Sequence, residues 1–405
     1  MIKDLVKYIL KNIMQELTRS VLTILSIAIG IMAIFALISF GQGVTKYTDS
    51  MFNEIGGDKL IAMPKGFSSP GTINIHFYDS DLEAIKKTNG VINYAPMIMR
   101  QAEVKSNKKE KGRWVFIAGG YASGKRGKLM DEMLAVGIEK GKHLKDSDKN
   151  KVVLGHNYQL PDKIFEKPLK LGDKIYINSI RYEVVGFFGE IGNPSDDSTI
   201  FMNLDEIKSL LGTGNTYDMV YIQVDKSFDL KKTADKIAER LRKNRKQKKG
   251  EEDFYIKSFE EILDTYSSVL SILNAILVII SLISVIVAAV NITNTMYTSV
   301  LDRTKEIGIM KAIGAKNSHI LFMFFVESGI LGIIGGAIGL ALGYIIAKAG
   351  GTIAAYYGYS MLRPYFSPLL AALLLVFSFA IGAFSGFFPA RQASKLKPAD
   401  TLRYE

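Results

Sequence analysis

Four long apolar runs divide the chain, and each is long enough to cross a lipid bilayer. They cover residues 21–43, 267–297, 319–348 and 368–389. A transmembrane helix needs about 20 mostly apolar residues, so the pattern predicts four membrane-spanning helices. The first run is uncharged over residues 21–40. It exceeds the roughly 7–15 apolar residues of a signal peptide, and no clear small-x-small cleavage site follows, so we expect a retained span.

Residues 1–20 show a different pattern, in which Leu5, Ile9 and Ile13 recur on one side and lysines occupy the other. This is typical of an amphipathic helix that lies in the membrane interface. Basic residues crowd the flanks of the runs, which favours cytoplasmic ends at a plasma membrane. The predicted segments are a cytoplasmic helix at 1–20, an outer domain at 44–266, a cytoplasmic loop at 298–318, a short outer loop at 349–367 and a cytoplasmic tail at 390–405.

Residues 44–266 lack such runs and read as a mixed α and β domain. We expect strands at 59–63, 73–77, 113–118, 151–154, 218–224 and 251–257, a hairpin of 174–178 with 181–187, and helices at 79–88 and 228–246. The last helix is strongly basic, which usually marks a solvated face. Contact with anionic headgroups or an anionic substrate is the alternative.

The composition narrows the function further. The chain has 405 residues, of which 48% are hydrophobic, and a formal net charge of +11. No nucleic-acid motif accompanies the basic excess, so we expect lipid and protein partners and no nucleic acid. The absence of cysteine excludes disulfides and thiolate chemistry. The four histidines form no ligand-like pair, so no metal site is expected.

One stretch, Gly119-Gly-Tyr-Ala-Ser-Gly-Lys-Arg126, nearly spells a phosphate-binding loop. Arg126 stands where a hydroxyl should hold magnesium, and no clear helix pattern follows. The predicted topology also places this stretch outside the cell. We therefore expect no nucleotide binding at this stretch, no catalytic constellation and no cofactor in this chain.

The segment between the second and third runs is short and charged. Arg303, Lys305 and Lys311 favour the cytoplasmic side. Ile307, Met310, Ile313 and Gly314 recur at helical intervals, which predicts a short amphipathic helix whose apolar edge is a docking surface. The simpler alternative is a loop that is basic only for correct membrane insertion.

The order of residues favours the first interpretation. Residues 303–315 read Arg-Thr-Lys-Glu-Ile-Gly-Ile-Met-Lys-Ala-Ile-Gly-Ala and closely resemble the signature of the MacB/FtsX-like ABC transporter permeases. The match extends to Asn291, Glu327 and the run Pro389-Ala-Arg-Gln-Ala-Ser-Lys-Leu-Lys-Pro398, which Leu402-Arg403 follows. The resemblance implies a coupling helix seated in a groove of a separate ATPase. The implied coupling residues are Arg303, Thr304, Lys305, Glu306, Ile307, Gly308, Ile309, Met310, Lys311, Ala312, Ile313, Gly314 and Ala315.

The same resemblance implies two permease copies, or one copy and a paralogue, working with two ATPases that carry ATP and Mg²⁺. It further implies an extracytoplasmic α+β domain of MacB type, with a porter-like part and an inserted β-rich part. The fold class expected is thus four transmembrane helices plus that domain.

Polar and small residues inside the apolar runs are interpreted as helix-packing residues. Glu327 is the one acid well inside a run, and we expect packing, with Asn291 as a hydrogen-bonding partner, rather than proton transport. Glycines crowd the third run at Gly332, Gly335, Gly336, Gly339 and Gly343. They would allow close helix packing, either within one chain or between subunits.

The expected function is the permease subunit of an exporting ABC transporter. One alternative is an FtsX-like signalling subunit that regulates an extracytoplasmic partner enzyme. A secondary transporter is disfavoured by the scarcity of membrane acids and of repeated spans. For a membrane-anchored binding protein, one span would suffice.

Overall fold

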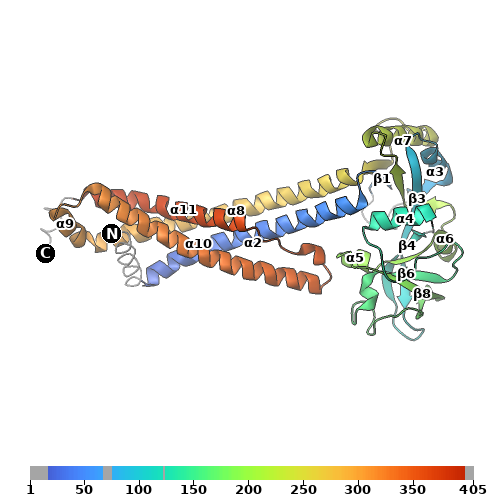
Figure 1. Cartoon of the computed structure of the whole chain (residues 1–405), viewed down its shortest axis with the longest axis horizontal. Helices are drawn as coiled ribbons and strands as arrows, with labels where there is room; N and C mark the ends of the chain where they lie inside the picture. The colour runs from blue at the N-terminus through green and yellow to red at the C-terminus, as the bar shows by residue number, and fades with distance from the viewer. Residues whose placement is uncertain (1–16, 67–74, 122–123, 397–405) are drawn as a thin grey trace. The chain divides into compact units, whose positions relative to one another are not determined.

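The computed structural model describes residues 17–66, 75–121 and 124–396 (Figure 1). The chain divides into two compact units. The first, here called the helical unit, comprises Met1–Val44, Val269–Ala354 and Leu362–Glu405. The second, the sheet unit, comprises Thr45–Ser268 and Ala355–Met361. Most of the expected N-terminal helix and nearly all of the tail after Lys395 lie outside the described residues.

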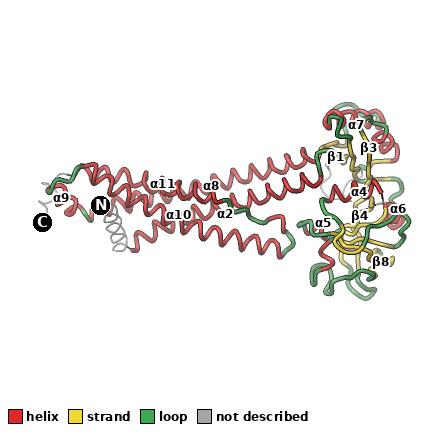
Figure 2. Tube along the Cα trace, in the orientation of Figure 1, coloured by secondary structure: helices red, strands yellow, loops and turns green. Residues whose placement is uncertain are grey.

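Long helices dominate the first unit (Figure 2). They are α2 (Leu17–Ile55), α8 (Phe259–Asp302), α10 (Asn317–Tyr356) and α11 (Pro368–Lys395), with the short α9 (Thr304–Ala312) between α8 and α10. Within the described residues, four stretches are long and apolar enough to span a membrane: Ser20–Ile55, Val278–Asp302, Asn317–Tyr356 and Pro368–Lys395. Helix α8 covers the whole of the expected run at 267–297.

Contacts between the helices fix their directions. Thr23 on α2 meets Thr295 on α8, whereas Gly30 lies against Val285, so the two helices are antiparallel. Along α10, Gly335 lies at Ile27 and Gly343 at Met32, so α10 is parallel to α2. Gly332 on α10 meets Ser378 and Gly386 on α11 meets Ser328, so α11 is antiparallel to α10. The helices therefore alternate in direction, and α9 lies at the end where α2 starts and α11 finishes.

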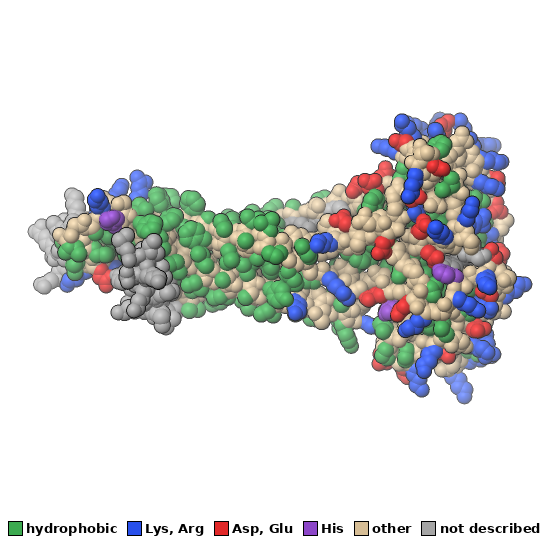
Figure 3. All heavy atoms as spheres, viewed as in Figure 1, with side chains coloured by type: hydrophobic (Ala, Val, Ile, Leu, Met, Phe, Trp, Pro, Cys, Tyr) green, Lys and Arg blue, Asp and Glu red, His purple; other side chains and the backbone are tan. Residues whose placement is uncertain are grey.

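The surface of the helical unit is apolar (Figure 3). Ile279, Ile283 and Ile286 on α8 are 59%, 56% and 62% exposed. Inside, Ile31, Ile292 and Phe324 are almost fully buried in one core. A contiguous apolar surface of this kind is expected where lipid is the solvent.

The sheet unit is built on one large mixed sheet. Its strands are β1 (Lys59–Pro64), β3 (Val91–Lys105), β4 (Arg113–Tyr121), β5 (Ile138–Gly141), β6 (Lys151–Leu154), β7 (Lys174–Ile177), β8 (Ile180–Phe188), β9 (Ile200–Asn203), β11 (Met219–Val224) and β12 (Phe254–Ser258). Their order is β12-β1-β11-β3-β4-β9-β6-β8-β5, with β7 beside β3 and β8. A small separate pair joins β2 (Phe77–Tyr78) to β10 (Thr216–Tyr217).

The long strand β3 joins two parts of this sheet. Its first half pairs with β11, and its second half pairs with β4. The part with β1, β11 and β12 carries the helices α3 (Asp79–Lys86) and α7 (Leu230–Arg245). The chain between β3 and β11 forms the other strands of the large sheet together with α4 (Gly124–Leu134), α5 (Pro194–Asp197) and α6 (Leu204–Leu211). This insertion is the β-rich part of the expected domain.

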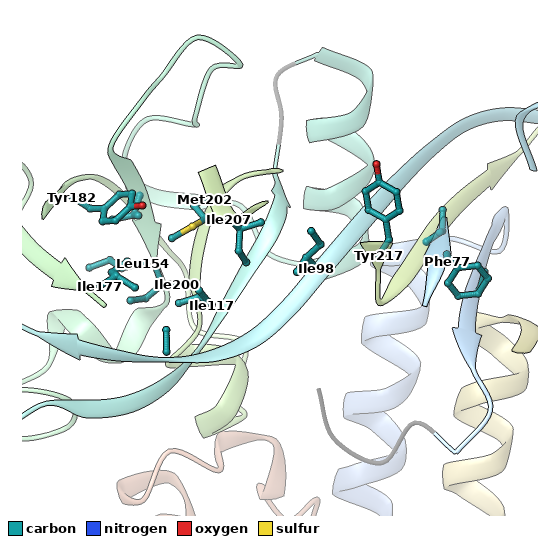
Figure 4. Close-up of a cluster of buried hydrophobic side chains, with 14 of the residues drawn as sticks. Phe77, Ile98, Ile117, Leu154, Ile177, Tyr182, Ile200, Met202, Ile207 and Tyr217 are labelled. Carbon is teal, nitrogen blue, oxygen red and sulfur yellow. The ribbon is translucent and has the colours of Figure 1, made fainter. Parts of the chain in front are cut away.

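Each face of the sheet is covered by a hydrophobic core. Successive residues of a strand point to opposite faces, so neighbouring residues of one strand belong to different cores. Leu60 and Ala62 of β1 face a core with Leu82 of α3 and Ile237 of α7. Ile61 faces the other core, which includes Met130 and Met133 of α4. The first core continues into the insertion, where Ile117, Leu154, Ile200 and Met202 meet (Figure 4). Helix α7 turns its buried residues to the sheet and its lysines outward, so the lysines of its basic run form a solvated face, whereas Arg245 of the same run is only 11% exposed.

Several expectations for this unit are confirmed. Strands β7 and β8 form the predicted antiparallel hairpin, and β1, β6, β11 and β12 lie close to their predicted positions. The predicted strand at 73–77 is wrong within the described residues, since β2 begins only at Phe77. The expectation that no helix follows Gly119 is also wrong, because α4 begins at Gly124.

Candidate coupling helix

Helix α9 begins where α8 breaks at Arg303. The backbone of Arg303 has φ −105° and ψ 17°, and its carbonyl still accepts the Ile307 N–H at 3.0 Å. The far end is closed by Gly314, whose φ of +103° lies in a region that only glycine adopts without strain. Around it, Ala315 N–H donates to Met310 O at 3.0 Å, which satisfies one terminal carbonyl. This turn reverses the chain into α10.

The helix has two faces of different character. Ile307 and Gly308 are buried, and Met310 packs against the core of the helical unit. Ile309 is 49% exposed and Ile313 is 82% exposed. At about 100° per residue, Ile309 and Ile313 lie about 40° apart, and Ile309 lies about 200° from Ile307. The predicted single apolar edge is therefore wrong: Ile307 and Met310 hold the helix, whereas Ile313 faces out.

The remaining predicted coupling residues also divide into exposed residues and residues that face the rest of the chain. Among the described residues of this segment, Lys305, Glu306, Ala312 and Gly314 are exposed, whereas Thr304 and Ala315 are half-buried. Thr304 Oγ1 lies within hydrogen-bonding distance of two carbonyls at the end of α8. Its hydroxyl thus helps to close α8 rather than extending outward.

Arg303 does not extend outward either. Its Nη1 donates to both carboxylate oxygens of Glu327 on α10, at 3.1 and 3.3 Å. The two side chains are only 12% and 4% exposed. A buried carboxylate needs a charged partner of this kind, because desolvating it alone is costly. This pair ties the start of α9 to α10.

The expected hydrogen bond from Asn291 to Glu327 is not formed. Asn291 Nδ2 instead donates to Ser26 Oγ on α2 at 3.0 Å, and Ser26 Oγ donates to Leu22 O at 2.9 Å. Asn291 therefore joins α8 to α2, and Arg303 takes the place that was expected for it.

Lys311 ties the other half of α9 to α11. Its Nζ donates to Ser394 O at 2.7 Å and to Leu396 O at 2.6 Å. These carbonyls belong to the end of α11, where a helix carries partial negative charge. Lys311 thus caps α11 and holds α9 against it.

The glycines of α10 face two neighbouring helices of the same chain. A Cβ at Gly335, Gly339 or Gly343 would lie 2.8, 2.6 or 3.0 Å from atoms of α2. At Gly332 and Gly336 a Cβ would overlap Ser378 on α11. All five glycines accordingly permit close packing within the chain, the first of the two interpretations left open above.

The stretch that resembles a phosphate-binding loop is used for packing. Gly119 lies under Ile207, where a Cβ would overlap that side chain. The Lys125 carbonyl accepts Asn93 Nδ2 at 2.7 Å, and the Arg126 guanidinium lies 5.1 Å from the Tyr94 ring centroid. In the described part of the chain, no group of three His, Asp or Glu residues is placed to hold a metal ion.

The sheet unit contains a buried charge network that the sequence did not indicate. Arg245 donates to Asp81 Oδ2 at 2.7 Å, to Asp253 Oδ1 at 2.8 Å and to the His76 carbonyl at 2.8 Å. Its guanidinium lies 4.9 Å from the centroid of the Phe77 ring. Burial lowers the pKa of Arg245, but the two aspartates outweigh burial, and the net pKa is raised. The network fastens the end of α7 to the start of α3.

A second acidic pair lies at α5. Burial raises the pKa of Asp196, and the charge of Asp197 raises it further, against a hydrogen bond from Asn193. Burial also raises the pKa of Asp197, although the N–H groups of Ile191 and Gly192 donate to it at 2.7 and 2.9 Å. Because their folded-state pKa values are raised, the two protonated carboxyl groups contribute to the stability of the fold. This contribution to stability is fully present below the unfolded pKa of about 3.9, and it is lost as the pH rises through the folded pKa.

Comparison with known proteins agrees with this architecture. The family model described as MacB-like periplasmic core domain matches residues 20–240, and that described as FtsX-like permease C-terminal matches residues 278–398. The chain is 36% identical to an uncharacterized ABC transporter permease, MJ1507, of Methanocaldococcus jannaschii, over 100% of this chain and 98% of that protein. It is 28% identical to the uncharacterized ABC transporter permease YknZ of Bacillus subtilis, over 99% and 98% of the two chains.

A third relative is longer. The macrolide export ATP-binding/permease protein MacB of Chlorobium phaeobacteroides is 27% identical over 98% of this chain, which spans 60% of that protein's length. The two family models and the relative of matching length agree on one assignment. The chain belongs to the MacB/FtsX-like family of ABC transporter permeases.

Proposed function

We propose that this permease couples ATP binding and hydrolysis on a separate ATPase to motion of its sheet unit, for export of a substrate. ATP and Mg²⁺ would be bound by the ATPase and not by this chain. The observation that carries the proposal is the exposed face of α9.

That face combines apolar and charged side chains in the way of a docking surface. Ile309 and Ile313 are 49% and 82% exposed, and Lys305 and Glu306 lie beside them on the outer side of the helix. Large apolar side chains rimmed by polar ones mark interaction sites. Buried Ile307 and partly buried Met310 anchor the helix, so a partner would meet a surface that is already ordered.

The ties of α9 support transmission of a push. Arg303 connects the helix to α10 and Lys311 connects it to α11, while α8 precedes it directly. Helices α2 and α8 run without interruption from the helical unit into the sheet unit. Rigid elements of this kind can carry a small displacement between distant sites.

The proposed topology places α9 in the cytoplasm. Lys305, Lys316 and Arg391 are exposed at the α9 end of the helical unit, and positive flanks favour the cytoplasmic side of a plasma membrane. Both ends of the described chain would then be cytoplasmic, and the sheet unit, inserted between α2 and α8, would lie outside. The proposed assembly contains two permease subunits and two ATPases, with the sheet unit free to meet an extracytoplasmic partner. The MacB relative is named for macrolide export, which supports an export role.

The proposal is tested by Ile313→Ser in the full-length permease, reconstituted in nanodiscs and titrated with the ATPase that co-purifies with the parent chain. Burying one isoleucine contributes about 1.5–3 kcal/mol, so binding should weaken by about tenfold or more, with loss of ATPase stimulation. The matched control is Ile353→Ser, since Ile353 is 59% exposed near the opposite end of α10. Equal binding by both variants would show that α9 is not the docking surface.

A further inference from the structure

A groove between α8 and α11 has no part in the proposed coupling. It has a volume of about 300 Å³ and is lined by Thr293 and Tyr297 of α8 and by residues of α11 that include Phe388, Arg391 and Lys395. It lies in the last turns of both helices, at the end of the helical unit that carries α9.

Pro389 shapes this groove from within α11. Proline has no N–H, so the carbonyl of Ser385, four residues earlier, loses its helical donor. Thr293 Oγ1 lies 3.0 Å from that carbonyl oxygen and within hydrogen-bonding distance of its own Ala289 carbonyl. The threonine thus joins α8 to α11 at the base of the groove and holds its two walls together.

The lining is divided into an aromatic part and a cationic part. Phe388 is 70% exposed and Tyr297 is 46% exposed. Arg391 and Lys395 follow one turn apart on α11, about 6 Å along the axis. Within the described residues, neither cation forms an ion pair, and both residues are exposed.

The position of the groove along α8 is the one expected for a site at the boundary of a bilayer. Helix α8 ends at Asp302. At 1.5 Å per residue, Tyr297 lies about 7 Å and Thr293 about 13 Å before that end. Tyrosine favours the headgroup level, so we expect the cations near that level and Phe388 beside the acyl chains.

We propose that this groove binds one anionic phospholipid, with its phosphate between Arg391 and Lys395 and an acyl chain along Phe388. A guanidinium binds phosphate oxygens through paired hydrogen bonds, and basic pockets between membrane helices suit anionic headgroups. A choline headgroup would bring a second cation to the same place. The inference uses the groove alone and does not depend on ATPase coupling.

The test uses tryptophan fluorescence in the full-length chain, because Trp114 is its single tryptophan. Trp114→Phe removes that signal, and Phe388→Trp places a reporter in the groove. The protein is reconstituted without ATPase in nanodiscs that contain brominated phosphatidylglycerol or brominated phosphatidylcholine at equal mole fraction. Quenching should show that the groove prefers phosphatidylglycerol over phosphatidylcholine. We expect each of the two cations to contribute about fivefold to this preference.

Arg391→Gln with Lys395→Gln in the reporter chain should abolish that preference. The matched control is Lys305→Gln with Lys316→Gln, which removes the same charge at the same end of the unit but outside the groove. The control should keep the preference, and millimolar inorganic phosphate should leave it unchanged.

Four results would overturn the proposal. Equal quenching by the two lipids would show no selectivity, and a preference that survives Arg391→Gln with Lys395→Gln would assign it to the general surface potential. Absence of quenching by either lipid would show that protein, not lipid, covers the groove. Displacement by inorganic phosphate would assign the cation pair to a soluble anion instead.

Discussion

The buried pair of Arg303 and Glu327 makes a quantitative prediction about α9. Removing Glu327 leaves the Arg303 charge buried without its partner, which costs about 3–5 kcal/mol. Replacing both members by apolar side chains of similar size is often nearly neutral. Glu327→Met should therefore release the start of α9, whereas Arg303→Met with Glu327→Met should leave it closed.

The energy refers to local opening rather than to global unfolding. When α9 detaches, the Arg303 guanidinium reaches water and its desolvation is relieved, so Glu327→Met penalises only the closed state. At 1.4 kcal/mol per factor of ten, a cost of about 3 kcal/mol increases the open population about 100-fold. The low exposure of the two side chains, 12% and 4%, justifies the buried rather than the surface value.

The opening of α9 can be measured by thiol labelling, because the chain has no cysteine of its own that would react. A single Ile307→Cys places a thiol at a fully buried position of α9, where it reacts only on opening. Its labelling rate should rise by about 100-fold with Glu327→Met and return to within about tenfold of the parent in the double variant. Rates within threefold of the parent for Glu327→Met, or additive effects of the two substitutions, would refute a coupled buried pair.

Three further predictions concern packing and charge. Gly339→Ala places a Cβ 2.6 Å from the Ala28 carbonyl oxygen and should cost about 1–3 kcal/mol, whereas Gly350→Ala meets only the end of a phenylalanine ring at 3.2 Å and should be tolerated. Thermal stability in detergent compares these two variants. Arg245→Lys loses the forked contacts to its aspartates and should cost about 2 kcal/mol or more, as measured by urea unfolding with Trp114 fluorescence. Asp196→Asn should stabilise the sheet unit at pH 7 and lose that advantage near pH 4, where the parent carboxyl takes up its proton; equal effects at both pH values would contradict the raised pKa.

The membrane helices could be predicted from the sequence because the bilayer imposes a strict rule on the chain. Helix α9 could be predicted because its apolar residues recur at helical intervals. A spanning segment must satisfy its backbone internally, so it forms a long apolar helix that composition alone reveals. The β7–β8 hairpin was similarly local, since its alternating pattern and short turn are neighbours in sequence. Strand β3 escaped prediction because Pro96 and Arg100 interrupt its pattern, although both residues pair in the sheet. It changes partner along its length, from β11 to β4, and no local pattern records such a change.

The two faces of α9 and its ties could not be predicted for a related reason. Periodicity identified the apolar positions of the helix, but which of them face inward depends on α10 and α11, which pack against it. Arg303 and Glu327 were each recognised separately, yet their pairing depends on the Gly314 turn that brings α10 back beside α9. A charged residue in a signature can serve the partner protein or its own fold, and only the three-dimensional arrangement distinguishes them. Here Arg303 and Lys311 fasten the helix to its own chain, while the apolar side chains of Ile309 and Ile313 remain exposed.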